Sequence, residues 1–194
     1  MSKREITKAD ILPLDEYVKV RKQRHAELIA LKKHRRIEIG PVATCYFENF
    51  DTMLHQVQEM LYIEKGGEEQ IADELSAYNP MIPNGRELTA TVMFEIDDPI
   101  RRKNFLSRLG GVEETMFIRF GDHEVKGVPE EDVDRTNAAG KASSVQFIHF
   151  PFTEAQASAF RSASQVLVGF SHEQYGHMTV LTEASRDALA ADFD

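Results

Sequence analysis

A short segment at positions 47–61, FENFDTMLHQVQEML, concentrates side chains that could carry acid–base or binding chemistry. Two carboxylates held near a substrate can act as general acid and general base, and a basic residue such as Arg36 could assist them. Loops and the ends of regular elements are where such sites are commonly built. The candidate residues in this segment are Glu48, Asn49, Asp51, Gln56 and Glu59.

The same segment has a structural explanation that stays open beside the functional one. A helix that follows the apparent strand needs only one cap, for which Asp51 or Thr52 is expected. Gln56 and Glu59 lie three positions apart, so they share one helix face just beyond the strand end. These polar groups could instead tie down the buried backbone of the turn-rich loop YNPMIPNG, which contains Asn79.

Seven histidines raise the question of a metal site. Asp51, His55 and Glu59 follow an i, i+4, i+8 spacing, which places potential ligands on one helix face. Such a string arises often on amphipathic helices, and no CxxC or HExxH pattern accompanies it. His172 and His177 are five positions apart, which is not the spacing of a helical ligand pair. We therefore expect no metal and no other cofactor.

The single cysteine, Cys45, lies among apolar residues in ATCYFE and is expected to be a small buried hydrophobe. No Gly-x-Ser-x-Gly elbow, Walker loop or Rossmann glycine pattern is present. One cysteine cannot form an intramolecular disulfide, which favours a reducing compartment. The first ten residues lack the apolar core of a signal peptide, and no run approaches about 20 apolar residues. A soluble cytoplasmic protein is therefore expected.

Charge is spread unevenly along the chain. Between Lys19 and Arg36 there are eight Lys or Arg residues and one acid, Glu27, which gives this segment +7. Because the whole chain carries −9, the remainder carries −16, and this acidity argues against non-specific nucleic-acid binding. The Lys32–Arg36 run, which includes Lys33, could hold an anion or an acidic partner, although a solvated helix face is the favoured interpretation. Segregated charge also favours a two-fold homo-oligomer.

The residues from Ile6 to Arg36 read as helix for most of their length, and Pro13 suits the start of a long helix. Arg21 lies on the same side as the apolar residues, where a nearby carboxylate usually satisfies a basic group, and it is a further candidate site residue. Apolar residues at helical spacing predict the face that packs on the core. They are Leu14, Tyr17, Val18, Leu28 and Leu31.

Residues 36–48 are expected to form a strand or a bent hairpin, and residues 87–96 a strand with one solvated face. A hairpin is expected to turn at Gly121-Asp122, and residues 128–143 are expected to form a flexible loop or lid. Further helices are expected at 51–61, 68–78, 98–109, 153–163 and 182–193, and further strands at 144–152 and 164–171. Together, these helices and strands predict a single α+β domain over residues 1–194, with helices packed against a mostly antiparallel sheet.

Six motifs occur in order along the chain: DILPLDEY, ALKKHRR, GP-x5-FEN-x-DT, QVQEML, AYNPMIPNGREL-x-AT and SVQFIHFP. With them the chain resembles a bacterial family of uncharacterised proteins, the domain-of-unknown-function family numbered 3501. The resemblance covers nearly the whole chain and implies a single domain, but it brings no activity with it. It also implies a redox or peroxide-stress context, because members of that family are often encoded beside rubrerythrin-like and iron–sulfur proteins.

The resemblance further implies which polar positions fit the family pattern. His172 matches a histidine near the end, whereas His55, His149 and His177 depart from the pattern, which weakens any metal site built on His55. The other matching residues are Lys32, Lys33, Arg35, Arg36, Glu48, Asn49, Asp51, Gln56, Gln58, Glu59, Asn79, Pro80, Pro83, Gly85 and Glu87.

Three functional hypotheses follow. The first is a cytoplasmic accessory or binding protein that acts with a protein partner, such as a redox or iron–sulfur protein. The second is a small-molecule enzyme that uses Glu48, Asp51 and Glu59 with Arg36. The third is an anion- or nucleotide-binding protein that uses the Lys32–Arg36 run. A deep pocket holding the three carboxylates together would favour the enzyme, and a flat apolar patch would favour the partner.

Overall fold

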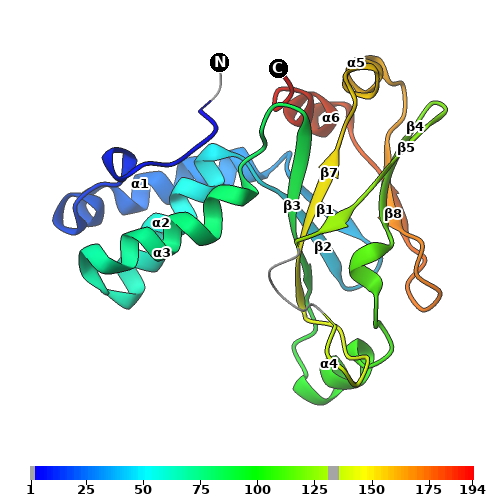
Figure 1. The fold of residues 1–194 in the computed structure, drawn as a ribbon, viewed down its shortest axis with the longest axis horizontal. Helices are drawn as coiled ribbons and strands as arrows, with labels where there is room; N and C mark the ends of the chain where they lie inside the picture. The colour runs from blue at the N-terminus through cyan, green and yellow to red at the C-terminus, as the bar shows by residue number, and fades with distance from the viewer. Residues whose placement is uncertain (1–2, 131–135) are drawn as a thin grey trace.

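Two antiparallel sheets form the body of the protein, and a layer of three helices extends to one side of it (Figure 1). The computed structural model describes residues 3–130 and 136–194. The strand order is β1-β2-β3-β7-β6 in one sheet and β5-β4-β8-β9 in the other. The strands are β1 (Arg36–Ile39), β2 (Ala43–Phe47), β3 (Glu87–Phe94), β4 (Met116–Phe120), β5 (His123–Lys126), β6 (Val128–Pro129), β7 (Val145–Pro151), β8 (Leu167–Phe170) and β9 (Met178–Val180).

The helices occupy three places around the sheets. α1, α2 and α3 form the helical layer, α5 and α6 lie at one end of the sheets, and α4 lies at the other end (Figure 1). The α+β class and the antiparallel pairing predicted from the sequence are confirmed. The helices are α1 (Leu14–Lys32), α2 (Phe50–Glu64), α3 (Gly67–Tyr78), α4 (Pro99–Leu106), α5 (Glu154–Ser162) and α6 (Glu183–Ala190).

Apolar side chains are buried on both faces of β3. Leu88, Ala90 and Val92 belong to the large core between the sheets. A second core, built from Ile6, Met53, Val57, Met81 and Ile82, lies between the helical layer and the opposite face of the same sheet. The prediction that one face of this strand is solvated is therefore wrong, because the helical layer and its loops cover that face. Thr89 on that face is fully buried, and its hydroxyl donates to the carbonyl of Met81 at 2.6 Å.

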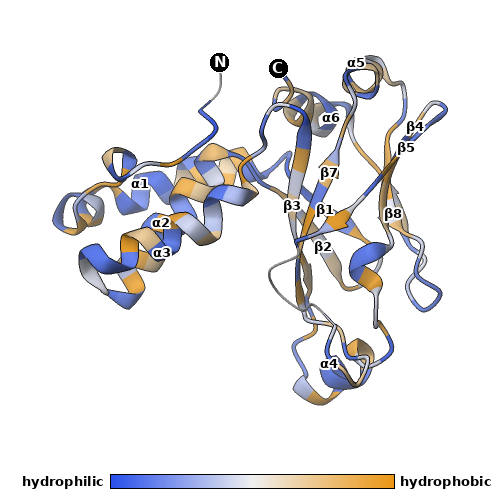
Figure 2. Ribbon diagram, viewed as in Figure 1, coloured by the Kyte–Doolittle hydropathy of each residue, from blue (hydrophilic) through white to orange (hydrophobic). Residues whose placement is uncertain are grey.

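Most of α1 is exposed, contrary to the apolar face predicted for it. Tyr17 is the one α1 residue that is fully buried, whereas Leu14 and Val18 are 40% and 52% exposed. The reason is tertiary: α1 packs mainly on α2, at the margin of the helical layer. Hydrophilic and hydrophobic stretches alternate along the helices of this layer (Figure 2). None of the described helices combines the length and apolarity that crossing a membrane requires.

Several predicted elements are confirmed, with adjusted ends. Residues 36–48 form the β1–β2 hairpin, and the predicted turn at Gly121-Asp122 joins β4 to β5. Gly40 turns the first hairpin with φ +70°, and a Cβ there would meet the Tyr175 hydroxyl at 2.8 Å. The predicted 98–109 helix is the shorter α4. The predicted 128–143 loop contains β6, and its residues 131–135 lie outside the described part of the chain.

Candidate functional site

The 47–61 segment is organised by a helix cap at Asn49. The Asn49 carbonyl oxygen of the side chain accepts from the Thr52 N–H at 3.0 Å, and the Thr52 hydroxyl accepts from the Asn49 N–H at 2.9 Å. This reciprocal arrangement satisfies two backbone donors at the start of α2. The prediction that Asp51 or Thr52 caps this helix is therefore wrong, because the N-cap residue is Asn49. The chain makes its last sheet bond at Glu48, whose N–H donates to the Thr89 carbonyl at 2.9 Å, and Asn49 directly after it caps the helix.

Glu59 joins α2 to α1. Its carboxylate accepts the Tyr17 hydroxyl at 2.5 Å and the Arg21 guanidinium at 2.8 and 2.7 Å. The Arg21 guanidinium also lies 4.5 Å from the centre of the Tyr62 ring, a cation–π distance. Arg21 hydrogen bonding lowers the pKa of Glu59 to about 2, and Tyr17 adds to the effect. Glu59 is therefore the carboxylate that the sequence predicted beside Arg21, and its contacts serve helix packing.

Two amide side chains hold the N-terminal segment to the helical layer. Gln58 accepts from the Leu12 N–H at 2.9 Å and donates to the Leu12 carbonyl at 3.0 Å. Asn79 does the same for Ile6, at 2.8 and 3.0 Å. Each side-chain amide thus satisfies both the N–H and the C=O of one residue in a segment that pairs with no strand. Among the residues that the structure describes, the Gln56 side chain donates to the Tyr78 hydroxyl alone, at 3.5 Å. These residues fit the structural explanation of the segment.

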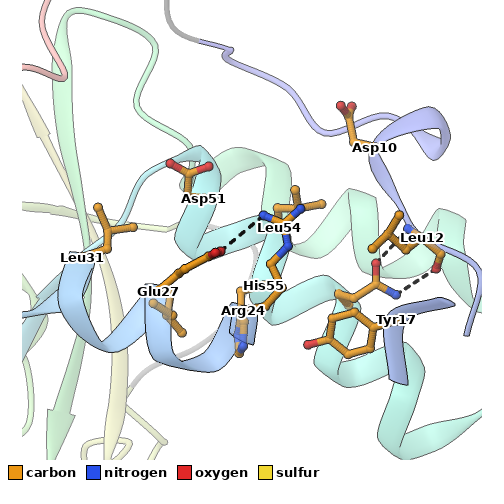
Figure 3. A pocket seen from close by; sticks show the side chains of 11 residues that line it. Asp10, Leu12, Tyr17, Arg24, Glu27, Leu31, Asp51, Leu54 and His55 are labelled. Carbon is orange, nitrogen blue, oxygen red and sulfur yellow. Dashed lines mark hydrogen bonds and ion pairs between the residues drawn. The ribbon is translucent and has the colours of Figure 1, made fainter. Parts of the chain in front are cut away.

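The structure does not bring the three carboxylates together. Glu48 is buried at the end of β2, and its Oε2 has no hydrogen-bond partner among the described residues. Glu48 precedes α2, whereas Glu59 lies in its third turn, about 14 Å along the helix axis from the first residue of α2. Asp51 is exposed and lines a pocket of about 350 Å³ between α1 and α2, which Figure 3 shows, but neither Glu48 nor Glu59 lines it. The arrangement that an acid–base enzyme requires is therefore absent from this cluster.

The basic run at the end of α1, Lys32–Arg36, contains both buried and exposed cations. Arg35 is buried and binds Asp192 with two bonds of 2.8 Å, and it also donates to the Ala188 carbonyl at 2.9 Å. Arg36 is exposed, 3.4 Å from Glu38. Lys33 is exposed and has no ion pair or hydrogen bond among residues 3–130 and 136–194. The exposed cations of this run, Lys33 and Arg36, are therefore the ones accessible to a ligand or partner.

These exposed cations line a wide, shallow groove, which we call the basic groove. It has a volume of about 990 Å³ and lies between the end of α1, β1, β9 and the start of α6. Ile29 and Val180 on its walls are 63% and 51% exposed. The sequence predicted the cations on the α1 side of the groove but not the opposite wall, because β9 was not predicted. The lining residues are His25, Leu28, Ile29, Ala30, Lys32, Lys33, His34, Arg36, Ile37, Glu38, Thr179, Val180, Thr182 and Ser185.

His172 lies away from both the 47–61 segment and the basic groove, in the turn before β9. Its Nδ1 accepts from the Gln174 N–H at 3.1 Å, so Nε2 carries the proton and donates to the Gly110 carbonyl at 3.2 Å. Both ring nitrogens are thus used to hold a turn. Cys45 is fully buried, and burial raises the pKa of its thiol. A small buried hydrophobe was predicted at this position, and the structure confirms it.

We predict that the purified protein contains no stoichiometric transition metal. Glu59 is engaged by Arg21 and Tyr17, and the described residues contain no group of three or more His, Cys, Asp or Glu side chains placed to hold an ion. Elemental analysis of protein purified without chelator is the measurement. Near one iron or zinc per chain, lost in His55→Ala, would contradict the prediction.

The fold and the site together define an α+β protein that presents a surface groove, with no assembled cluster of catalytic side chains among its candidate residues. Residues 5–193 match the model of the family described as "Protein of unknown function (DUF3501)", and the chain belongs to this family. The fold is also similar to the crystal structure of a novel protein of unknown function from Burkholderia pseudomallei K96243. That protein is 35% identical, the match covers 97% of this chain and 99% of that one, and the TM-score is 0.90. The curated proteins contain no match.

Proposed function

We propose that the protein is an accessory protein that binds an acidic, partly apolar surface of a protein partner in the basic groove. One observation carries the proposal: Lys33 and Arg36 are exposed beside Ile29 and Val180, which are more than half exposed. Large exposed apolar side chains beside charged ones are typical of interaction sites. A carboxylate-bearing partner complements the groove, since Glu38 is the one acid among its lining residues.

The setting of this interaction is part of the proposal. The family resemblance suggests that the partner is a redox or iron–sulfur protein. We propose the cytoplasm as the compartment, which agrees with a single, buried cysteine. An enzyme built on Glu48, Asp51 and Glu59 gains no support, because these residues do not share a pocket. The anion- or nucleotide-binding alternative uses the same cations and is therefore included in the test.

The experiment compares Lys33→Glu with Lys103→Glu, a charge-matched control on exposed α4. Partners captured by the wild-type protein are identified, purified and titrated back by calorimetry. We expect Lys33→Glu to weaken binding about tenfold or more through charge repulsion, and Lys103→Glu to change it less than about twofold. Carbodiimide cross-linking of the purified complex should join partner carboxylates to Lys32 or Lys33.

Three outcomes would overturn the proposal. A partner that binds wild-type and Lys33→Glu protein equally, with cross-links elsewhere, would place docking on another face. Saturable binding of ATP or pyrophosphate that Lys33→Glu abolishes would assign the groove to small anions. A dimer of this chain that Lys33→Glu dissociates and that excludes every other protein partner from the groove would assign the groove to self-association.

A two-fold homodimer remains a separate prediction, drawn from the segregated charge. The segment Lys19–Arg36 carries +7 and the rest of the chain −16, so basic and acidic faces can pair across an isologous contact. Multi-angle light scattering should give twice the chain mass of 22.0 kDa at low salt, and added salt should weaken the dimer. A mass of one chain at every salt and protein concentration would contradict the prediction.

A further inference from the structure

Two edge strands meet at the basic groove. β1 is the last strand of one sheet and β9 is the last strand of the other. The two strands are neighbours in space, yet within residues 3–130 and 136–194 no backbone hydrogen bond joins them. An edge strand presents a row of unpaired N–H and C=O groups, which is a template for pairing with another chain.

The register of β9 identifies which of its backbone groups are free. The Leu181 N–H donates to the Val166 carbonyl at 2.9 Å, which turns the backbone of Leu181 toward β8. Alternate residues of an antiparallel strand direct their backbone groups to opposite sides. The N–H and C=O groups of Met178 and Val180 therefore point away from β8, on the open edge. The side chains of these two residues are each 51% exposed.

The same reasoning applies to β1. The Phe47 N–H donates to the Arg35 carbonyl at 2.9 Å, so the backbone of Arg35 faces β2. By alternation, the backbone groups of Arg36 and Glu38 face outward. The groove is thus bordered by two strand edges with free backbone groups, and the side chains of Lys33 and Arg36 lie in its lining. An occupant that covers these edges must satisfy their backbone groups or leave them buried and unpaired, which is unfavourable.

We propose that the partner docks through an extended acidic segment that adds as a strand to the free edge of β9. This inference rests on the proposed function and specifies how the partner binds. Strand addition pairs the backbone groups of Met178 and Val180, while alternate side chains of the segment place carboxylates near Lys33 and Arg36. A helical segment packed on α1 would leave those backbone groups without partners, because the groups of a helix bond within the helix.

The test removes one backbone donor and keeps the rest of the site. Val180→Pro deletes the outward N–H of β9, a position where proline is tolerated because that N–H does not pair with β8. Val180→Ala is the matched control, since it shortens the same side chain and keeps the N–H. With the purified partner, we expect Val180→Pro to weaken binding about tenfold and Val180→Ala less than about threefold. Circular dichroism and thermal melts establish that both variants fold.

A second measurement uses unmodified protein, so the proposal stays testable if Val180→Pro does not fold. A short peptide of alternating Glu and Val is compared with the same peptide N-methylated at every second residue, which keeps charge and side chains but removes backbone donors. We expect the first peptide to bind in the groove and the N-methylated one to lose binding about tenfold. The amide hydrogen of Val180 should exchange more slowly in the complex.

The outcomes separate this inference from the proposed function. Equal binding of both peptides, or of the partner to Val180→Pro and Val180→Ala, would overturn strand addition and leave docking in the groove intact. Unchanged exchange at Val180 in a complex that Lys33→Glu disrupts would have the same meaning. A partner insensitive to Lys33→Glu would overturn the proposed function itself.

Discussion

Arg35→Ala is expected to destabilise the protein by about 3–5 kcal/mol, because it breaks a buried ion pair. The Arg35 and Asp192 side chains are 5% and 9% exposed and share two bonds of 2.8 Å. Removing the guanidinium leaves the Asp192 carboxylate buried without its counter-charge. It also frees the Ala188 carbonyl, so the attachment of α6 to the start of β1 is lost. Urea unfolding followed by circular dichroism measures the change.

Arg36→Ala is the matched control, because it removes the same group one position along the chain. Arg36 is exposed and its ion pair with Glu38 spans 3.4 Å, so the cost is expected to stay within about 1 kcal/mol. Equal urea midpoints for the two variants would show that the buried pair contributes little. A soluble but unfolded Arg35→Ala protein, beside a native Arg36→Ala protein, would agree with the prediction.

Glu59→Gln is expected to cost about 2 kcal/mol, because the neutral amide replaces charge-assisted hydrogen bonds from Tyr17 and Arg21. The larger cost of an isolated buried charge does not apply, since the Arg21 side chain is 40% exposed and water can solvate it. If Glu59 serves packing, biological activity should follow the amount of folded protein. Asp51→Asn, which removes a charge from the same helix at an exposed site, should be nearly neutral.

The Glu59 contribution should depend on pH in a defined direction. Its pKa falls from the ordinary value of 4.5 to about 2 on folding, chiefly because of the Arg21 hydrogen bonds. The stabilisation is therefore complete above pH 4.5 and is lost as the pH falls toward 2. The stability gap between wild-type and Glu59→Gln protein should be constant near neutrality and shrink over this window. A gap that persists at pH 2, or a Glu59→Gln protein of native stability without activity, would contradict the packing role.

Complementation of a deletion strain links these melts to function. A Glu59→Gln protein that folds at wild-type levels and fails to complement would restore the 47–61 segment as a functional site. Lys33→Glu should fail to complement while remaining folded, because Lys33 has no partner among the described residues that its loss could disturb. The two variants thus separate the packing of the helical layer from docking in the basic groove.

The sequence by itself determined the features that depend on local pattern. Alternation of β-forming residues around Gly121 predicted the β4–β5 hairpin, because a two-residue turn fixes the pairing of its own flanks. The apolar neighbours of Cys45 predicted its burial. Strand and helix order then sufficed for the α+β class.

Only the tertiary structure decided what the polar residues do. Arg35 and Arg36 are adjacent and chemically identical, yet one is buried because Asp192, 157 positions away, lies beside it. Val18 is exposed because α1 lies at the margin of its layer, which the period of its apolar residues cannot show. The basic groove exists because β9 and α6 fold against the end of α1. Contacts between segments that are far apart in the sequence decide which of these side chains are buried. The pattern of residues within one segment does not indicate which other segment will pack against it.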